Sequence, residues 1–159
     1  MIKLYNNSKL PSILFTKMIK HAMKQLNLEG DVIVLVTKGR QGGGMFYGGH
    51  VFKDGRFGHR NWVPSKLGKI IINPWTTSDP LQCAKHIYEC VMHEFKHSFD
   101  WVNKTVAFVY KDNNGKKLIY SKRPQEISAR FFEKYQAKYD DGILLDLAIA
   151  IAEIQKENN

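Results

Sequence analysis

The chain has 159 residues, the size of a single domain, and 43% of them are hydrophobic, enough for a packed core. It contains no apolar run of the roughly 18 to 20 residues that cross a membrane, and it begins without the apolar stretch of a secretory signal. The net charge of +9 would suit nucleic acid or another acidic partner, but no nucleic-acid-binding motif supports that interaction. We therefore expect one cytoplasmic domain over residues 1–159, with no membrane association.

The first half of the chain predicts one helix and three strands. A stripe of apolar residues over 11–27, which Pro11 or Ser12 starts, is typical of an amphipathic helix. Strands are expected at three runs rich in β-branched or apolar residues, namely 32–36, 45–52 and 66–73. Residues 39–49 contain many glycines, but their spacing does not match a phosphate-binding loop. We interpret this stretch as a flexible turn or flap between strands.

The second half predicts three helices and a hairpin. The sequence Ser-Asp-Pro at 78–80 is a strong helix start, with a capping side chain followed by proline, and this helix runs to about Val102. An Asp-Asn-Asn-Gly turn indicates a hairpin, with short strands at 105–110 and 117–120. Two further helices are expected, at 124–138 and 140–154. Together these elements predict an α+β fold with a small mixed or antiparallel sheet.

The pentapeptide His-Glu-Phe-Lys-His at 93–97 lies inside the expected helix 80–102. His93 and His97 are one turn apart and face the same way, so both imidazoles can bind one metal ion. Glu94 points about 100° away from His93, where it can reach a water on that metal without binding the metal itself. The flanking residues are largely apolar, and a buried cluster of this kind needs the compensating charge that a metal supplies. The pattern therefore predicts a zinc site.

A catalytic zinc site needs a third protein ligand and an open position for water. Glu126 is the candidate, because it lies in the first turn of the helix that Pro124 opens, 29 residues beyond His97. The hairpin between the two helices allows the second helix to fold back against the first.

Four other side chains compete for a place at this site. Glu133 shares a helix face with Glu126 and is the alternative third ligand. Cys90 would make a closed, structural zinc site. His86 and Asp100 lie on the same side of their helix as the two histidines, and we interpret them as neighbours of the site or surface groups.

The pentapeptide, followed by a glutamate on the next helix, resembles the gluzincin group of zinc metallopeptidases, particularly its minimal single-domain prokaryotic and phage members. The resemblance covers residues 68–138. It implies a zincin-like fold and one zinc per chain, held by His93, His97 and Glu126. It also implies that Glu94 is the general base in the hydrolysis of a peptide or protein substrate. The metzincin group is excluded, because its additional Gly and His are missing after the pentapeptide.

The resemblance has one clear departure. Larger members of the group carry an Asp four residues after the ligand glutamate, where it orients a ligand histidine, and Arg130 stands at that position here. Four side chains are open candidates for stabilising the oxyanion: Tyr120, Tyr135, Tyr139 and Arg130. Residues 68–73 are expected at the sheet edge, where an extended substrate could pair with them. Trp62, Trp75 and Trp101 are expected in the core, with a pocket wall as the alternative for Trp75.

Two readings of function follow. The first is a zinc-dependent endopeptidase with Glu94 as general base. The alternative is a zinc-stabilised basic binding module for nucleic acid or an acidic protein, without proteolytic activity. The DNA-associated SprT-like metallopeptidases share the pentapeptide and a basic surface, but their third ligand is usually histidine, and no histidine follows His97. A metal-free interaction protein that docks through its apolar last helix is a third possibility.

Overall fold

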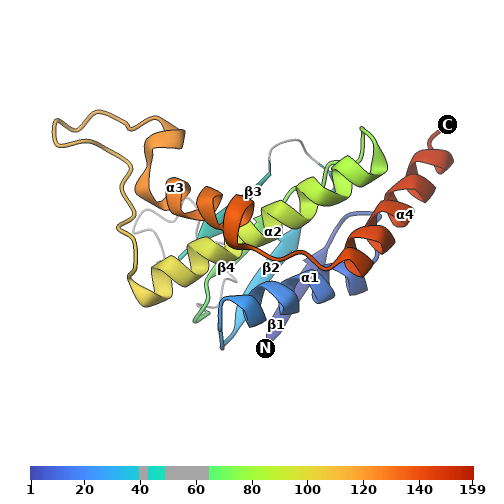
Figure 1. The fold of residues 1–159 in the computed structure, drawn as a ribbon, viewed down its shortest axis with the longest axis horizontal. Helices are drawn as coiled ribbons and strands as arrows, with labels where there is room; N and C mark the ends of the chain where they lie inside the picture. Colours follow the sequence, from blue (N-terminus) through green and yellow to red (C-terminus); the bar gives the residue numbers. More distant parts are fainter. Residues whose placement is uncertain (40–42, 49–64) are drawn as a thin grey trace.

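A computed structural model describes residues 1–39, 43–48 and 65–159 (Figure 1). These residues form an α+β fold of four α-helices and one four-stranded mixed sheet, which confirms the expected fold class. None of the described helices combines the length and apolar character needed to cross a membrane.

The sheet has the strand order β1-β2-β4-β3. Its strands are β1 (Ile2–Asn6), β2 (Val32–Val36), β3 (Gly44–Tyr47) and β4 (Lys69–Ile72). The pairs β1–β2 and β2–β4 are parallel, whereas β3 runs antiparallel to β4. The prediction that residues 68–73 form an edge strand is therefore wrong, because β4 has a neighbour on each side. The edge position beside β4 belongs to β3.

The sheet contains one strand that the sequence does not predict, β1, and one that it predicts in part, β3. The strand β1 was not expected, because it is short and only its alternate residues are partly buried. The expected strand 45–52 is confirmed over residues 45–47, which belong to β3; only Gly44, the first residue of β3, lies solely in the stretch 39–49 that we interpret as a turn or flap. Residues 49–52 of the expected strand 45–52 lie outside the described part of the chain.

The helices follow the sequence signals closely. They are α1 (Ser12–Gln25), α2 (Pro80–Asn103), α3 (Pro124–Phe131) and α4 (Asp141–Glu157). The Asp79 side chain accepts a hydrogen bond from the backbone N–H of Gln82 at 3.0 Å and caps α2 as predicted. Asp140 caps α4 in the same way. The helix expected at 124–138 changes after α3 into one π-helical turn at Phe132–Gln136.

The core lies between the helices and one face of the sheet. Figure 1 shows α1 and α2 in front of the strands, with α3 packed on α2 and α4 beside α1 and α2. One cluster of buried apolar residues joins the sheet with α1, α2 and α4. The central helix α2 contributes fully buried side chains such as Tyr88 and Phe95. Burial of one such aromatic side chain contributes about 1.5–3 kcal/mol to folding, so the core holds the middle of α2 firmly in place.

The segment between α2 and α3 keeps the turn of the predicted hairpin and one antiparallel bridge across it, but it lacks the predicted strands. Its turn is present, because the side chain of Asp112 accepts hydrogen bonds from the backbone N–H groups of Asn114 and Lys116, each at 2.9 Å. The strands expected at 105–110 and 117–120 are wrong, since residues 104–119 make a single isolated bridge between Lys111 and Lys117. Most of these residues are exposed, and a two-stranded ladder with nothing packed on it is marginal in water.

Candidate metal centre

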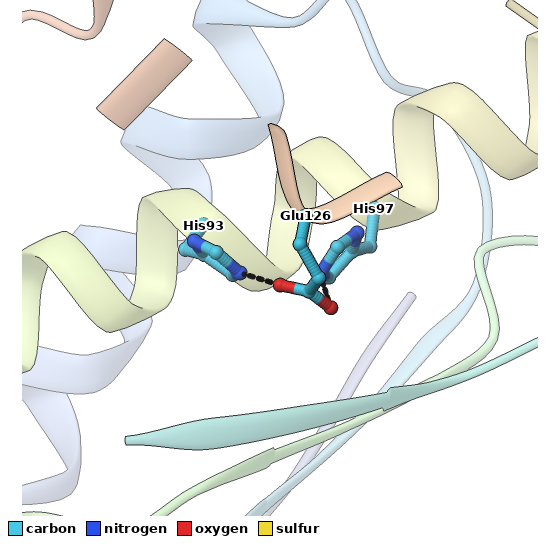
Figure 2. Close-up of side chains that lie close together, drawn as sticks. All are labelled: His93, His97 and Glu126. Atoms are coloured by element: carbon cyan, nitrogen blue, oxygen red, sulfur yellow. Dashed lines mark hydrogen bonds and ion pairs between the residues drawn. The ribbon is translucent and has the colours of Figure 1, made fainter. Parts of the chain in front are cut away.

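Two neighbouring helices bring the three expected ligands together. His93 and His97 lie on consecutive turns of α2, and Glu126 lies in the first turn of α3. Nε2 of His93 is 2.9 Å from one carboxylate oxygen of Glu126, and Nε2 of His97 is 3.1 Å from the other (Figure 2). All three residues are buried, and their ligand atoms lie within 4.8 Å of one another. They are therefore close enough to bind a metal ion.

The electrostatics of these residues fit a cation. Burial opposes the charged form of His93, but hydrogen bonds to Glu126 and Glu133 outweigh it and raise the pKa of His93 to about 10. Burial also opposes ionisation of Glu126, but hydrogen bonds from His93 and His97 hold the pKa of that carboxyl well below its usual range. The site therefore keeps an ionised carboxylate and attracts positive charge. Two imidazole nitrogens with a carboxylate oxygen are typical ligands of catalytic zinc.

Glu94 is the buried group beside the three ligands. Its side chain is 3% exposed, and its Oε2 has no hydrogen-bond partner among the described residues. Burial raises the pKa of Glu94 to about 8; the charge of His93 opposes this shift, and the Glu126 carboxylate adds to it. Such an orphaned oxygen is unusual in a folded interior and indicates that Glu94 serves something other than stability.

Space for Glu94 depends on a glycine in the neighbouring strand. A Cβ atom at Gly44 would lie 2.9 Å from Cγ and 3.0 Å from Oε1 of Glu94, and 2.7 Å from the carbonyl oxygen of Ile71. Only a residue without a side chain lets β3 approach α2 this closely. Gly44 is therefore required at the site. The interpretation of residues 39–49 as a flexible turn did not predict this contact with Glu94.

The competing ligands are placed elsewhere. Oε2 of Glu133 lies 3.4 Å from Nδ1 of His93, the ring nitrogen opposite the one that faces Glu126. Sγ of Cys90 lies 3.7 Å from Nε2 of His86, and burial raises the pKa of this thiol to about 12. Within the described residues, the side chains that converge as possible ligands are the two histidines of the pentapeptide and Glu126. The structure therefore supports neither Glu133 nor Cys90 as a ligand.

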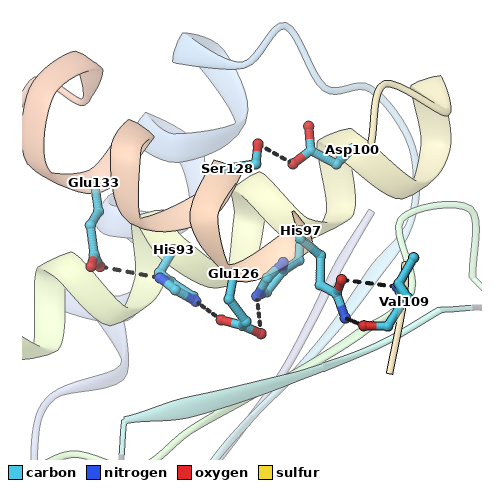
Figure 3. Close-up of polar contacts among 8 residues, drawn as sticks. His93, His97, Asp100, Val109, Glu126, Ser128 and Glu133 are labelled. Carbon is cyan, nitrogen blue, oxygen red and sulfur yellow. Dashed lines mark hydrogen bonds and ion pairs between the residues drawn. The ribbon is translucent and has the colours of Figure 1, made fainter. Parts of the chain in front are cut away.

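Asp100 has a role that the sequence did not reveal. It is fully buried and accepts hydrogen bonds from Lys96 Nζ at 2.9 Å, Thr105 Oγ1 at 2.7 Å and Ser128 Oγ at 2.7 Å. The bond to Ser128 connects α2 with α3 (Figure 3). Asp100 therefore fixes how the helix that carries Glu126 lies against the helix that carries the histidines.

A second connection holds the segment before α3. The Gln125 side chain accepts a hydrogen bond from the N–H of Val109 at 3.0 Å and donates one to the carbonyl oxygen of Val109 at 3.1 Å (Figure 3). The amide thus pairs with the backbone as another strand would. No sequence signal identifies this contact, because it depends on where the segment 105–119 returns in space.

A cavity of about 550 Å³ opens beside Glu94, His97 and Glu126. Strand β3 forms one wall, and aromatic side chains form much of the lining: Phe46, Tyr47, Trp101, Phe108, Tyr110 and Tyr120. Trp101 therefore lines the cavity and is not a core residue. Trp75 packs edge-on against His86, with ring centroids 5.9 Å apart, and Trp62 lies outside the described residues.

The four candidates for oxyanion stabilisation occupy different places. Tyr120 lines the cavity and hydrogen-bonds to Glu126, and burial raises the pKa of its phenol. Tyr135 is 75% exposed, whereas Tyr139 donates its hydroxyl hydrogen to the carbonyl oxygen of Glu133 at 2.6 Å. The Arg130 guanidinium lies over the Tyr120 ring, 5.5 Å from its centroid. Tyr120 is therefore the candidate that faces both the ligand Glu126 and the cavity.

Comparison of the chain with family models, with curated proteins and with solved structures gives no match. The residues of the site and the cavity beside it therefore carry the functional proposal.

Proposed function

We propose that this protein is a zinc-dependent endopeptidase of gluzincin type, with a zincin-like fold and one zinc per chain. The observation that carries the proposal is the convergence of His93, His97 and Glu126 beside the buried, unpartnered carboxyl of Glu94. A set of three protein ligands at the margin of a cavity leaves room for a water and a substrate, as catalytic zinc sites do. Structural zinc sites, in contrast, are usually closed by four protein ligands.

The chemistry divides between the metal and the chain. When zinc is bound, it lowers the pKa of a coordinated water from about 15.7 toward 7 and polarises the substrate carbonyl. Glu94 takes the proton of the attacking water and passes it to the leaving amine. The Oε2 atom of Glu94 has no hydrogen-bond partner among the described residues, so it is free to accept the proton between these two steps.

The cavity provides groups for orienting a peptide. Strand β3 pairs with β4 on one side and ends the described sheet on the other, so an extended peptide can add to β3 through backbone hydrogen bonds. We therefore propose β3 as the substrate-binding strand, in place of residues 68–73, which lie inside the sheet. The hydroxyl of Tyr120 is the side-chain donor that we assign to the oxyanion, because it lines the cavity beside Glu126.

The substitution Glu94→Gln tests the proposal, because it keeps the shape of the side chain and removes the base. Protein purified without an affinity tag is expected to contain one zinc per chain in both the wild type and this variant. Cleavage of a peptide library, followed by mass spectrometry, should be lost in the variant by a factor of about 10²–10⁴. A His97→Ala variant, which removes a ligand, should lose both the zinc and the activity.

Three outcomes would count against the proposal. Full activity of Glu94→Gln would exclude Glu94 as the general base. Wild-type protein that contains no zinc would exclude a zinc-dependent reaction. Zinc binding without cleavage of any library peptide would favour the alternative of a zinc-stabilised binding module.

A further inference from the structure

The imidazole of His93 lies between two carboxylates. Its Nε2 is 2.9 Å from Glu126, and its Nδ1 is 3.4 Å from Oε2 of Glu133 (Figure 3). The side chains of His93 and Glu133 are only 10% and 17% exposed, so solvent screens their interaction weakly. His97 lacks such a partner, because its buried Nδ1 has no hydrogen-bond partner within the described residues.

Helix geometry explains why Glu133 reaches His93. Glu133 follows Glu126 by seven residues, which is about two helical turns, so both carboxylates leave α3 and its continuation on the face that meets α2. The Arg130 guanidinium lies over the ring of Tyr120, 5.5 Å from its centroid.

The backbone that carries Glu133 is anchored. Glu133 lies in the π-helical turn Phe132–Gln136, which the bond from the N–H of Ala137 to the carbonyl oxygen of Phe132 closes at 2.7 Å. The hydroxyl of Tyr139 donates to the carbonyl oxygen of Glu133 itself at 2.6 Å. The Tyr139 ring packs edge-on against the fully buried Tyr88 of α2, with centroids 5.1 Å apart.

We propose that Glu133 is a positioning residue of the metal centre. It accepts a hydrogen bond from Nδ1–H of His93 and so selects the tautomer whose Nε2 lone pair faces the site beside Glu126. This proposal rests on the zinc site proposed above. A ligand histidine held in this way is better oriented and more basic, and loss of its partner typically weakens metal binding about 10- to 100-fold. Glu133 thus takes the orienting role that the resemblance gave to the position now occupied by Arg130.

The test compares zinc affinity between Glu133→Ala, Glu133→Gln and a matched control, Glu89→Ala. Glu89 is exposed on α2, one turn before His93, and its replacement removes the same charge from the same neighbourhood. Zinc dissociation constants are measured by competition with a chromogenic chelator, and thermal melting of the metal-free proteins checks the fold. The visible absorption of bound Co²⁺ reports the geometry of the ligands.

Glu133→Ala is expected to weaken zinc binding about 10- to 100-fold and to alter the Co²⁺ bands. Glu133→Gln should lose less affinity, because its amide oxygen still accepts the hydrogen bond, and Glu89→Ala should bind as the wild type does. If Glu133→Ala does not fold, Glu133→Gln provides the test. A loss of zinc affinity in Glu133→Gln that is absent from Glu89→Ala would support the positioning role.

Two results would overturn the positioning role and leave the zinc site intact. One is wild-type affinity in the folded Glu133 variants. The other is an equal loss in Glu133→Ala and Glu89→Ala, which would indicate a general effect of charge. A wild type that binds no zinc would instead overturn the proposed function, and the positioning role with it.

Discussion

The two histidines of the site lie one turn apart, with ring centroids separated by 4.7 Å, but their surroundings differ. His93 lies among carboxylates, between Glu126 and Glu133. His97 lies against aromatic rings, with centroid distances of 6.2 Å to Phe46 and 6.0 Å to Phe108, and it lines the cavity. One side of the site is thus suited to hold a cation and the other to receive the apolar parts of a substrate. Substitutions of the residues around the two histidines, with the histidines themselves kept, should therefore separate metal binding from substrate binding.

The largest effect is expected from Gly44→Ala, which acts on the cavity side. The new methyl group would contact Ile71 and Glu94 at distances that carbon atoms do not tolerate, so Glu94 or β3 must move. A displacement of about 1 Å at a catalytic group lowers the rate about 100-fold. We expect kcat to fall by about this factor while zinc affinity stays at the wild-type value, measured by peptide cleavage and by chelator competition. Loss of zinc from this variant would show that the two sides are not separable.

An intermediate effect is expected from pH, and it acts on the His93 side. In the metal-free protein the pKa of His93 is raised to about 10, so zinc must displace a proton from this imidazole at neutral pH. The apparent zinc affinity should therefore rise with pH, by up to about tenfold per unit, as long as the pH stays below that pKa. Calorimetric titration in buffers of different ionisation enthalpy measures the protons released. Affinity that does not change between pH 6.5 and 8.5 would contradict the charged state that we assign to His93.

The smallest effect is expected from Phe108→Ala, which removes part of the aromatic wall. KM for peptides that place a large apolar side chain in the cavity should rise about tenfold, with kcat and zinc affinity unchanged, because only uniform substrate binding is lost. Ile119→Ala is the control, since Ile119 belongs to the same segment, is 65% exposed and does not line the cavity. An equal rise of KM in both variants would assign the effect to the segment as a whole and not to the wall.

The parts of the site that the sequence predicted are those with local causes. Asp79 and Pro80 start α2 through capping and a fixed backbone angle, and helical periodicity then places His93 and His97 on one face. Glu126 could be proposed because Pro124 begins a second helix at a short distance along the chain. These signals involve residues close together in the sequence, so they do not depend on how distant segments pack.

The parts that the sequence did not predict depend on contacts between distant segments. The position of β3 at the sheet edge is decided by strand order, and residues 69–72 look the same in an interior or an edge strand. The contacts of Asp100 with Ser128 and of Gln125 with Val109 exist only after α3 has packed on α2. In the segment 105–120 the turn was predicted correctly, but the flanking strands did not form, because most of these residues are exposed.

The two hydrogen bonds between Gln125 and Val109 connect the proposed metal site with the cavity wall. Gln125 and the proposed ligand Glu126 are consecutive residues, so the first turn of α3 contacts both the backbone beside Phe108 and the two histidines of α2. A metal ion that ordered this turn would also order the backbone at Val109, to which Gln125 is hydrogen-bonded. If a peptide that orders this backbone strengthens zinc binding, thermodynamic reciprocity requires zinc to strengthen peptide binding by the same factor. The affinity for zinc and the affinity for peptide would then increase together.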